Sequence, residues 1–226
     1  MQVGAGNAWR GLVHVALVAG LLTGCGEGAE DDAKAGASAS ASNPADAADA
    51  ANTAPEGVES GGTIGAAGSP CELPVTFDIA VKWEAESAPG ASKEVPEELA
   101  DMVLRQGPVT AACEVDAKPA GHIGFLRIWT GEPGDADARA VLEEFLAAEK
   151  GVSEEKYTPF EAGDLSGTEV EYLYTSELMD ETKTERALAV ATPDGPVVLH
   201  LGGLDTAEHE AMLPAYELAK RTLRAS

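Results

Sequence analysis

Two histidines, His122 and His200, are the side chains of this sequence that could do chemistry together. Each falls in a stretch that predicts a β-strand, so one sheet could bring the two rings side by side. Two imidazoles with nearby carboxylates would suit a transition-metal site or a hydrolase. The alternative is that each is a half-buried packing residue of its strand. A deep polar pocket holding both would favour chemistry, and scattered, exposed histidines would count against it.

Two other patterns resemble metal sites but lack essential ligands. His209-Glu210 begins like the zinc-protease motif HExxH, but Leu213 stands where the second histidine must be, so this pair is expected on a solvated turn of the last helix. Asp135 and Asp137 begin like a calcium loop whose later ligands are missing, and helix capping explains them better. No motif for an enzyme, a metal or a cofactor remains, and we expect none.

The first of the three cysteines, Cys25, lies where an exported protein would be processed. Arg10 precedes a short apolar run over residues 11–22, which is the order of a secretory signal. As a helix this run would reach about 18 Å, too short for a hydrocarbon layer of about 30 Å. The residues Leu22-Thr23-Gly24-Cys25 resemble the bacterial lipobox, in which cleavage precedes a cysteine that then carries diacylglycerol. The alternative is an ordinary signal peptide with an incidental cysteine.

If Cys25 is lipidated, the protein is predicted to be anchored to the outer face of the cell membrane, with residues 1–25 as signal and lipobox. Cys71 and Cys113 then remain as a pair in an oxidising compartment, which favours a disulfide. Such a crosslink would stabilise the fold by about 4 kcal/mol through unfolded-chain entropy. The alternative is two buried free thiols.

Residues 26–70 predict a disordered tether rich in Ala, Gly, Ser and acids. Val58 and Ile64 are its only branched aliphatic residues, so it cannot bury enough apolar surface to offset the entropy of ordering. As a flexible coil it would span roughly 40 Å.

The strongly acidic balance excludes one class of partner. The whole chain has a formal net charge of −24, and residues 71–226 hold 13 basic and 31 acidic residues. Such a surface repels phosphate backbones, so nucleic-acid binding is not expected. Solubility in a crowded exterior is its simplest explanation.

Residues 71–226 predict one globular α+β domain. Alternating apolar and polar residues predict strands over 75–81, 109–115, 122–129, 168–175, 183–191 and 196–201. Helical spacing and capping residues predict helices over 96–106, 135–150 and 206–223, the last kinked at Pro214. Asp194-Gly195 predicts a hairpin turn. Short turns between strands imply a largely antiparallel sheet with helices packed against it.

Three segments carry a resemblance to a known family. Val-Thr-Phe-Asp-Ile…Val-Lys-Trp at 75–83, Leu-Ser-Gly-Thr-Glu-Val at 165–170 and Ala-Tyr-Glu-Leu-Ala at 215–219 resemble the PsbP-like domain. Within that fold, the chain is most similar to actinobacterial lipoproteins of the LpqN type, which also join a lipobox and tether to one such domain. The resemblance implies an α/β/α sandwich that binds a partner, and it assigns no residue a role.

We therefore predict a binding or scaffold module of the cell envelope, with a protein or lipid-like partner. Exposure of Trp129 or Tyr172 would favour this reading, because aromatic anchors concentrate at interfaces. The alternative is that both fill the core. The alternative function is a hydrolase or metal-handling protein that uses His122, His200 and nearby acids.

Overall fold

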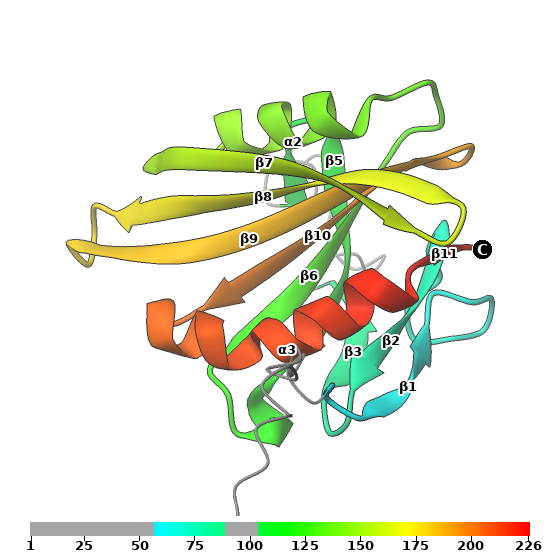
Figure 1. The fold of residues 1–226 in the computed structure, drawn as a ribbon, viewed down its shortest axis with the longest axis horizontal. Coiled ribbons are helices and arrows are strands. Elements are labelled where there is room, and N and C mark those ends of the chain that lie inside the picture. Colours follow the sequence, from blue (N-terminus) through cyan, green and yellow to red (C-terminus); the bar gives the residue numbers. More distant parts are fainter. Residues whose placement is uncertain (1–56, 89–103) are drawn as a thin grey trace, which may run out of the picture. The chain divides into compact units, whose positions relative to one another are not determined.

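The fold is built on a large antiparallel sheet (Figure 1). The computed structural model describes residues 57–88 and 104–226, and within these residues eight strands form this sheet. The strand order is β3-β5-β6-β10-β9-β8-β7, with β4 paired to β5. The strands are β3 (Glu84–Ser87), β4 (Arg105–Gln106), β5 (Val109–Asp116), β6 (Gly124–Gly131), β7 (Val152–Ala162), β8 (Leu165–Ser176), β9 (Glu181–Thr192) and β10 (Gly195–Gly203).

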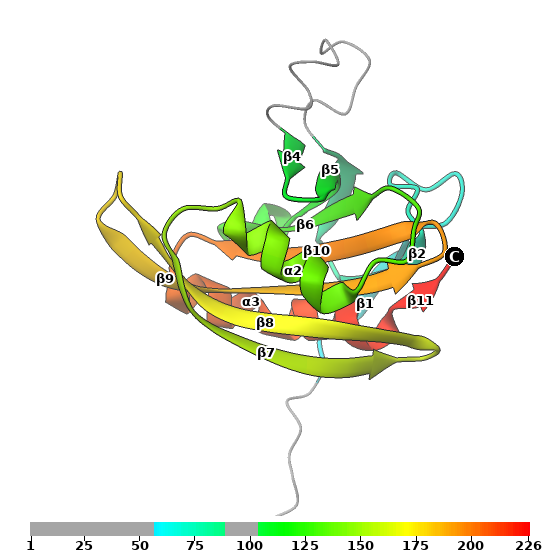
Figure 2. The same cartoon turned by 90° about the horizontal axis from the view of Figure 1, so that it is seen from above.

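Helices and a smaller sheet cover the two faces of the large sheet. Helix α2 (Ala138–Ala147) packs on one face, over β7 to β10 (Figure 2). Helix α3 (Thr206–Thr222) lies on the other face with a second sheet of order β1-β2-β11. The remaining elements are β1 (Ser60–Ile64), β2 (Val75–Ala80), β11 (Arg224–Ala225) and the 3-10 helix η1 (Lys118–Ala120). The predicted α+β class and the α/β/α sandwich are confirmed.

Each face of the large sheet has its own hydrophobic core. The core between the sheet, α3 and the small sheet includes Phe77, Ile128, Leu199, Met212 and Tyr216. The core beneath α2 includes Val109, Leu142, Phe145, Val170 and Val198. Trp129 and Tyr172 belong to this second core, with 5% and 1% of their surfaces exposed. Neither is therefore an exposed interface anchor, and the alternative that both fill the core is correct.

Local sequence rules account for the predicted helices. Asp205 begins α3, and its side chain accepts a hydrogen bond of 2.8 Å from the Glu208 backbone N–H, as the capping pattern predicted. Asp137, and not Asp135, caps α2 by accepting from Ala140 N at 2.9 Å. Pro214 lies inside α3 as expected. The apolar positions that predicted the inner faces of both helices are buried.

The turn between β9 and β10 follows the predicted hairpin. Gly195 adopts a φ of +116°, and a Cβ at this position would lie 2.2 Å from the carbonyl oxygen of Gly131. Only glycine avoids both the backbone strain and this clash. The hairpin therefore fixes the register of β10, including the place of His200.

Several expectations were wrong at the edges of the sheets. Residues 57–70 are not a featureless part of the tether, because β1 pairs with β2 and buries Ile64. A helix was predicted over residues 96–106, but Arg105 and Gln106 form the short strand β4. A turn at Gly107 lets this strand pair with β5. Residues 96–103 lie outside the described residues. In each case the partner strand supplies the hydrogen bonds, which the local sequence does not reveal.

Strand β7 was not predicted, because its sequence lacks a regular alternation. It forms one edge of the large sheet and is interrupted by a bulge between Ser153 and Lys156. Glu154, within this bulge, has a φ of +57°. Pro159 occupies a later position in the strand. A bulge, charged residues and a proline are all typical of sheet edges.

Cys71 and Cys113 form a disulfide in the structure, with their Cα atoms 5.8 Å apart. Cys71 precedes β2 and Cys113 lies within β5, so the crosslink joins the small sheet region to the large sheet. Both residues are buried. Cys25 lies outside the described residues. Neither α2 nor α3, the α-helices bounded in the described residues, combines the length and hydrophobicity of a membrane span.

Candidate functional site

Helix α2 covers only part of its face of the large sheet. Its 10 residues extend for about 15 Å, whereas the 12 residues of β9 extend for roughly 40 Å. Alternate residues of β9 share this face: Ala187 and Ala189 belong to the core beneath α2, whereas Glu185 and Lys183 continue the row beyond it. The face therefore changes from apolar to charged where the helix ends.

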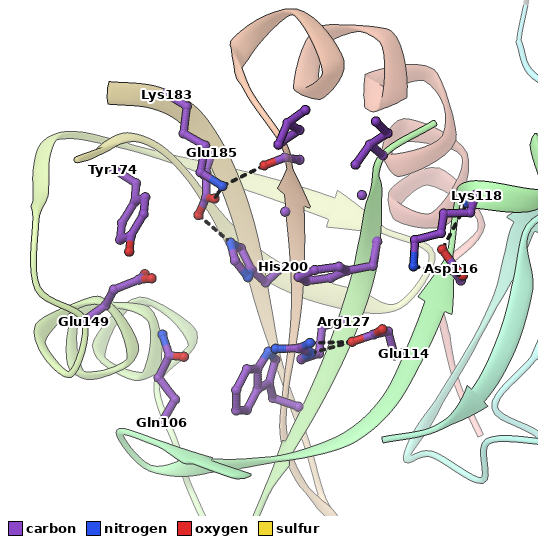
Figure 3. Close-up of a pocket in the computed structure, with 17 residues that line it drawn as sticks. Gln106, Glu114, Asp116, Lys118, Arg127, Glu149, Tyr174, Lys183, Glu185 and His200 are labelled. Carbon is purple, nitrogen blue, oxygen red and sulfur yellow. Dashed lines mark hydrogen bonds and ion pairs between the residues drawn. The ribbon is translucent and has the colours of Figure 1, made fainter. Parts of the chain in front are cut away.

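A cavity of about 430 Å³ occupies this part of the face, and we call it the polar cavity (Figure 3). Strands β5, β6, β9 and β10 contribute charged and aromatic side chains to its walls. Glu149, just beyond the end of α2, closes one side. The ring of Phe145 contacts Trp129 edge-on and also lies against His200, so the core beneath α2 leads directly into the cavity.

The floor of the polar cavity is a buried network centred on Glu185. One Glu185 oxygen lies 2.9 Å from His200 Nε2 and accepts a hydrogen bond of 3.0 Å from the Tyr172 hydroxyl. The other oxygen lies 2.6 Å from Lys183 Nζ, which also donates to the Gly203 carbonyl at 2.7 Å. Tyr172 and Glu185 are directly opposed on β8 and β9. The sheet register therefore assembles the network, and Glu185 has partners on both oxygens.

The charge of Glu185 determines which hydrogen bond His200 makes with it. Burial alone would raise the pKa of Glu185, but the charge and hydrogen bond of His200, together with Lys183, lower that pKa to about 2. A charged carboxylate accepts hydrogen bonds only, so Nε2 of His200 must carry the proton. When the ring is neutral, Nδ1 is an acceptor, and no described residue donates a hydrogen bond to it. In that form His200 offers the cavity one hydrogen-bond acceptor.

Two further polar atoms around the polar cavity have no hydrogen-bond partner among the described residues. They are Nε1 of Trp129 and Oε2 of Glu149, and both atoms are buried. Burial raises the pKa of Glu149, which favours its neutral form. Unpaired buried polar groups are uncommon, because each costs about 1–3 kcal/mol of desolvation. A ligand that bonds to them would remove that cost.

The charged groups of the cavity walls, in contrast, are already paired. Arg127 makes two hydrogen bonds to one oxygen of Glu114, and its guanidinium also lies 4.4 Å from the centre of the Phe125 ring. Lys118 forms a weaker ion pair with Asp116 at 3.9 Å. The groups left for a ligand are therefore neutral donors and acceptors.

A second, larger cavity of about 750 Å³ adjoins the polar cavity, and we call it the open cavity. The two share Tyr174, Lys183, Gly203 and Leu204 as lining residues. Met179 lines only the open cavity, and both Met179 and Leu204 are exposed large hydrophobic residues. The pair of cavities thus combines a polar floor with an apolar exit.

The structure separates the two histidines that the sequence suggested could meet. His122 lies in the turn before β6 and its Nδ1 is 2.8 Å from Glu208 Oε1 of α3. In the ladder between β10 and β6, His200 lies opposite Arg127, and Arg127 is five residues after His122. Five residues of extended chain place the two histidines on the order of 15 Å apart. The described residues contain no group of three or more potential ligands arranged for a metal ion. Only His200 belongs to a polar pocket.

His209 also lies elsewhere than expected. It is not on a solvated turn but is 1% exposed beneath α3, and neither ring nitrogen has a partner among the described residues. Burial and the nearby charge of Arg186 lower its pKa to about 4. His209 precedes the buried Met212 by three residues, so both lie on the inward face of α3. This helical spacing was visible in the sequence and could have predicted that His209 is buried.

The described residues define a class of fold: an α+β sandwich with a polar pocket between one face of its sheet and the end of a helix. The chain belongs to the family described as uncharacterised lipoprotein (Lipoprotein_23), whose model matches residues 41–223. The prediction of a lipoprotein is thereby confirmed. No curated protein sequence matches the chain significantly.

Solved structures similar to this chain include both proteins that the sequence pattern resembles. Cyanobacterial PsbP from Synechocystis is 11% identical, with a TM-score of 0.45, over 68% of this chain and 87% of its own. LpqN of Mycobacterium tuberculosis, described as involved in cell envelope biogenesis, is 14% identical, with a TM-score of 0.38, over 73% and 91%. A Pseudomonas aeruginosa protein of unknown function is 15% identical, with a TM-score of 0.39, over 67% and 91%.

Proposed function

We propose that this lipoprotein is a binding module of the cell envelope, anchored through Cys25 to the outer face of the membrane, and that its cavities bind a lipid-like ligand with an uncharged polar head. The observation that carries the proposal is the polar cavity itself. It combines a preorganised charged network with two unpaired buried atoms, Trp129 Nε1 and Glu149 Oε2, and with His200 Nδ1, which is an acceptor when the ring is neutral.

The arrangement of partners supports an uncharged head group. Lys183, Arg127 and Lys118 each already face a carboxylate, so an anionic head would have to displace an existing ion pair. A hydroxyl group can accept from the Trp129 N–H and donate to His200 Nδ1 or a Glu149 oxygen. An alcohol or polyol head group therefore fits these three groups better than a phosphate or a carboxylate.

The open cavity supports an apolar tail on the same ligand. It begins at Tyr174 and Leu204, which also line the polar cavity, and it continues past Met179 to solvent. A chain lying there would cover apolar side chains that are otherwise exposed, at about 25 cal/mol per Å² of buried surface. The sequence predicted a binding or scaffold module with a protein or lipid-like partner, and this geometry favours the lipid-like partner.

The Glu185–His200 pair supports a second candidate function, a hydrolase in which His200 Nδ1 accepts a proton from water. No serine, threonine or cysteine is among the described residues that line the polar cavity, so water itself would have to be the nucleophile. Binding requires no such additional component, and we therefore propose binding. Release of fatty acid from a monoacylglycerol, abolished by His200→Gln, would instead establish the hydrolase.

Binding can be tested with a monoacylglycerol that carries a fluorescent acyl chain, using the mature chain with Cys25→Ser so that it is soluble. We expect saturable binding that Trp129→Phe weakens about tenfold, because one hydrogen bond to a buried group is lost. Trp83→Phe is the matched control, since Trp83 is 7% exposed but lies in the core on the other face. Equal effects of the two substitutions, or no binding by the parent protein, would refute the proposed ligand class.

The anchor can be tested separately. The native protein should partition into detergent and its mature N-terminus should carry acyl mass on Cys25, because two acyl chains at about 0.8 kcal/mol per buried CH₂ bind membrane firmly. Cys25→Ser should move the protein to the aqueous phase. A native chain that stays aqueous and lacks acyl mass contradicts the anchor.

A further inference from the structure

The turn between β8 and β9 presents two large apolar side chains to solvent. Leu178 is 95% exposed and Met179 is 56% exposed. Leu178 lines neither cavity, so the proposed ligand does not explain it. Figure 1 shows this turn at one end of the large sheet, where it extends beyond the neighbouring strands.

The turn is held in a defined conformation. Ser176 and Glu181 are the last paired residues of the hairpin, and the Met179 N–H donates to the Ser176 hydroxyl at 3.3 Å. The hydroxyls of Thr175 and Thr182 lie 2.9 Å apart across the strands. Because the hairpin fixes the backbone of this short segment, less backbone entropy is lost when the segment binds a partner.

The turn is continuous with the mouth of the open cavity. Met179 lines that cavity together with Leu204, which is 48% exposed. The Leu204 N–H donates to the Ile123 carbonyl at 3.0 Å, and Ile123 is 53% exposed. Four of the five exposed large hydrophobic residues in the described part of the chain therefore line the two adjoining cavities or directly precede a residue that does, and we call Ile123, Leu178, Met179 and Leu204 the apolar rim. Contiguous exposed apolar surface marks interaction sites.

The charge around the apolar rim restricts what can cover it. The exposed acids beside it are Glu177, Asp180, Glu181 and Asp205. Lys183, the basic residue that lines the open cavity, is half-buried and already paired with Glu185. Acidic borders repel anionic lipid and also repel the same surface of a second copy. A protein with an apolar depression bordered by arginine or lysine is complementary in both respects.

We propose that the apolar rim, with its acidic border, is the docking surface for a second envelope protein whose matching surface is apolar at its centre and basic at its edge. Leu178 is the central contact, and the mouth of the open cavity faces the partner. The surface does not depend on what the cavities bind, although its position would let a ligand pass between the two proteins without entering water.

The test uses the full-length chain in its native membrane, with a photo-reactive phenylalanine analogue placed at Leu178. The matched control places the same analogue at Val81, which is 45% exposed, lies between β2 and β3 and is not part of the apolar rim. We expect one crosslinked protein from position 178 and none from position 81. Mass spectrometry identifies that protein, which is then purified for binding measurements.

Binding of the purified partner should weaken at least tenfold with Leu178→Ser and with the paired change Glu177→Lys, Asp180→Lys. Both variants should keep the parent's unfolding midpoint and its uptake of the monoacylglycerol probe, because these residues are exposed and line neither cavity. A crosslink to lipid, a crosslink to a second copy, equal products from both positions, or a partner insensitive to the charge change would each overturn the proposal.

Discussion

Reduction of the Cys71–Cys113 disulfide is expected to lower the free energy of unfolding by about 4 kcal/mol. The crosslink closes a loop with a sequence separation of 42, and opening it restores that chain entropy to the unfolded state. Denaturant titrations with and without reductant would measure the loss. The dependence of the unfolding free energy on denaturant should also become steeper, because the reduced unfolded chain exposes more surface.

The control for this prediction is the double variant Cys71→Ala, Cys113→Ala, whose unfolding should not respond to reductant at all. Both cysteines are buried, so the variant also loses some packing, and the comparison that matters is its response to reductant. An unfolding midpoint that is the same in reduced and oxidised wild-type protein would contradict a stabilising crosslink.

The second large effect concerns pH and originates at His209. Its pKa is lowered from the ordinary 6.5 to about 4, so between these values the unfolded chain binds a proton that the folded chain does not. Stability must therefore fall as the pH decreases through this window. From pH 7 to pH 5 the loss should be about 2 kcal/mol, at 1.36 kcal/mol per pKa unit.

His209→Leu should remove this dependence and leave stability at pH 7 unchanged or higher, because an apolar side chain replaces two unpaired nitrogens. The measurement is the free energy of unfolding at pH 7 and at pH 5, a range that avoids the titration of Glu185, whose pKa is about 2. His122→Gln is the control: it replaces a half-exposed ring, so the variant should still lose unfolding free energy between pH 7 and pH 5. If His209→Leu lost as much unfolding free energy between pH 7 and pH 5 as the wild type, His209 would not be the source of the pH dependence.

Most of the fold followed from local patterns in the sequence. The capping of α3 by Asp205 and the β9–β10 turn at Gly195 depend on neighbouring residues alone. Strands at the sheet edges could not be found this way, because their hydrogen bonds come from distant partners. β7 shows this most clearly: its bulge removes the alternation that predicts a strand.

The site was only partly predictable. His200 was a candidate, but its partners depend on the register of three strands, which the sequence does not specify. One signal was available: Lys183 and Glu185 continue the row of Ala187 and Ala189 on the same side of a predicted strand. Where the residues on one face of a strand change from apolar to charged, the helix that packs on that face is expected to end.

The irregular edge strand β7 also affects behaviour at high local concentration. The proposed anchor would confine many copies to a plane, where exposed sheet edges could join into continuous polymers. Pro159 offers no N–H to an incoming strand, and the kink at Glu154 prevents a flat approach. Crowding on a surface should therefore leave the copies as separate units, free to exchange partners laterally.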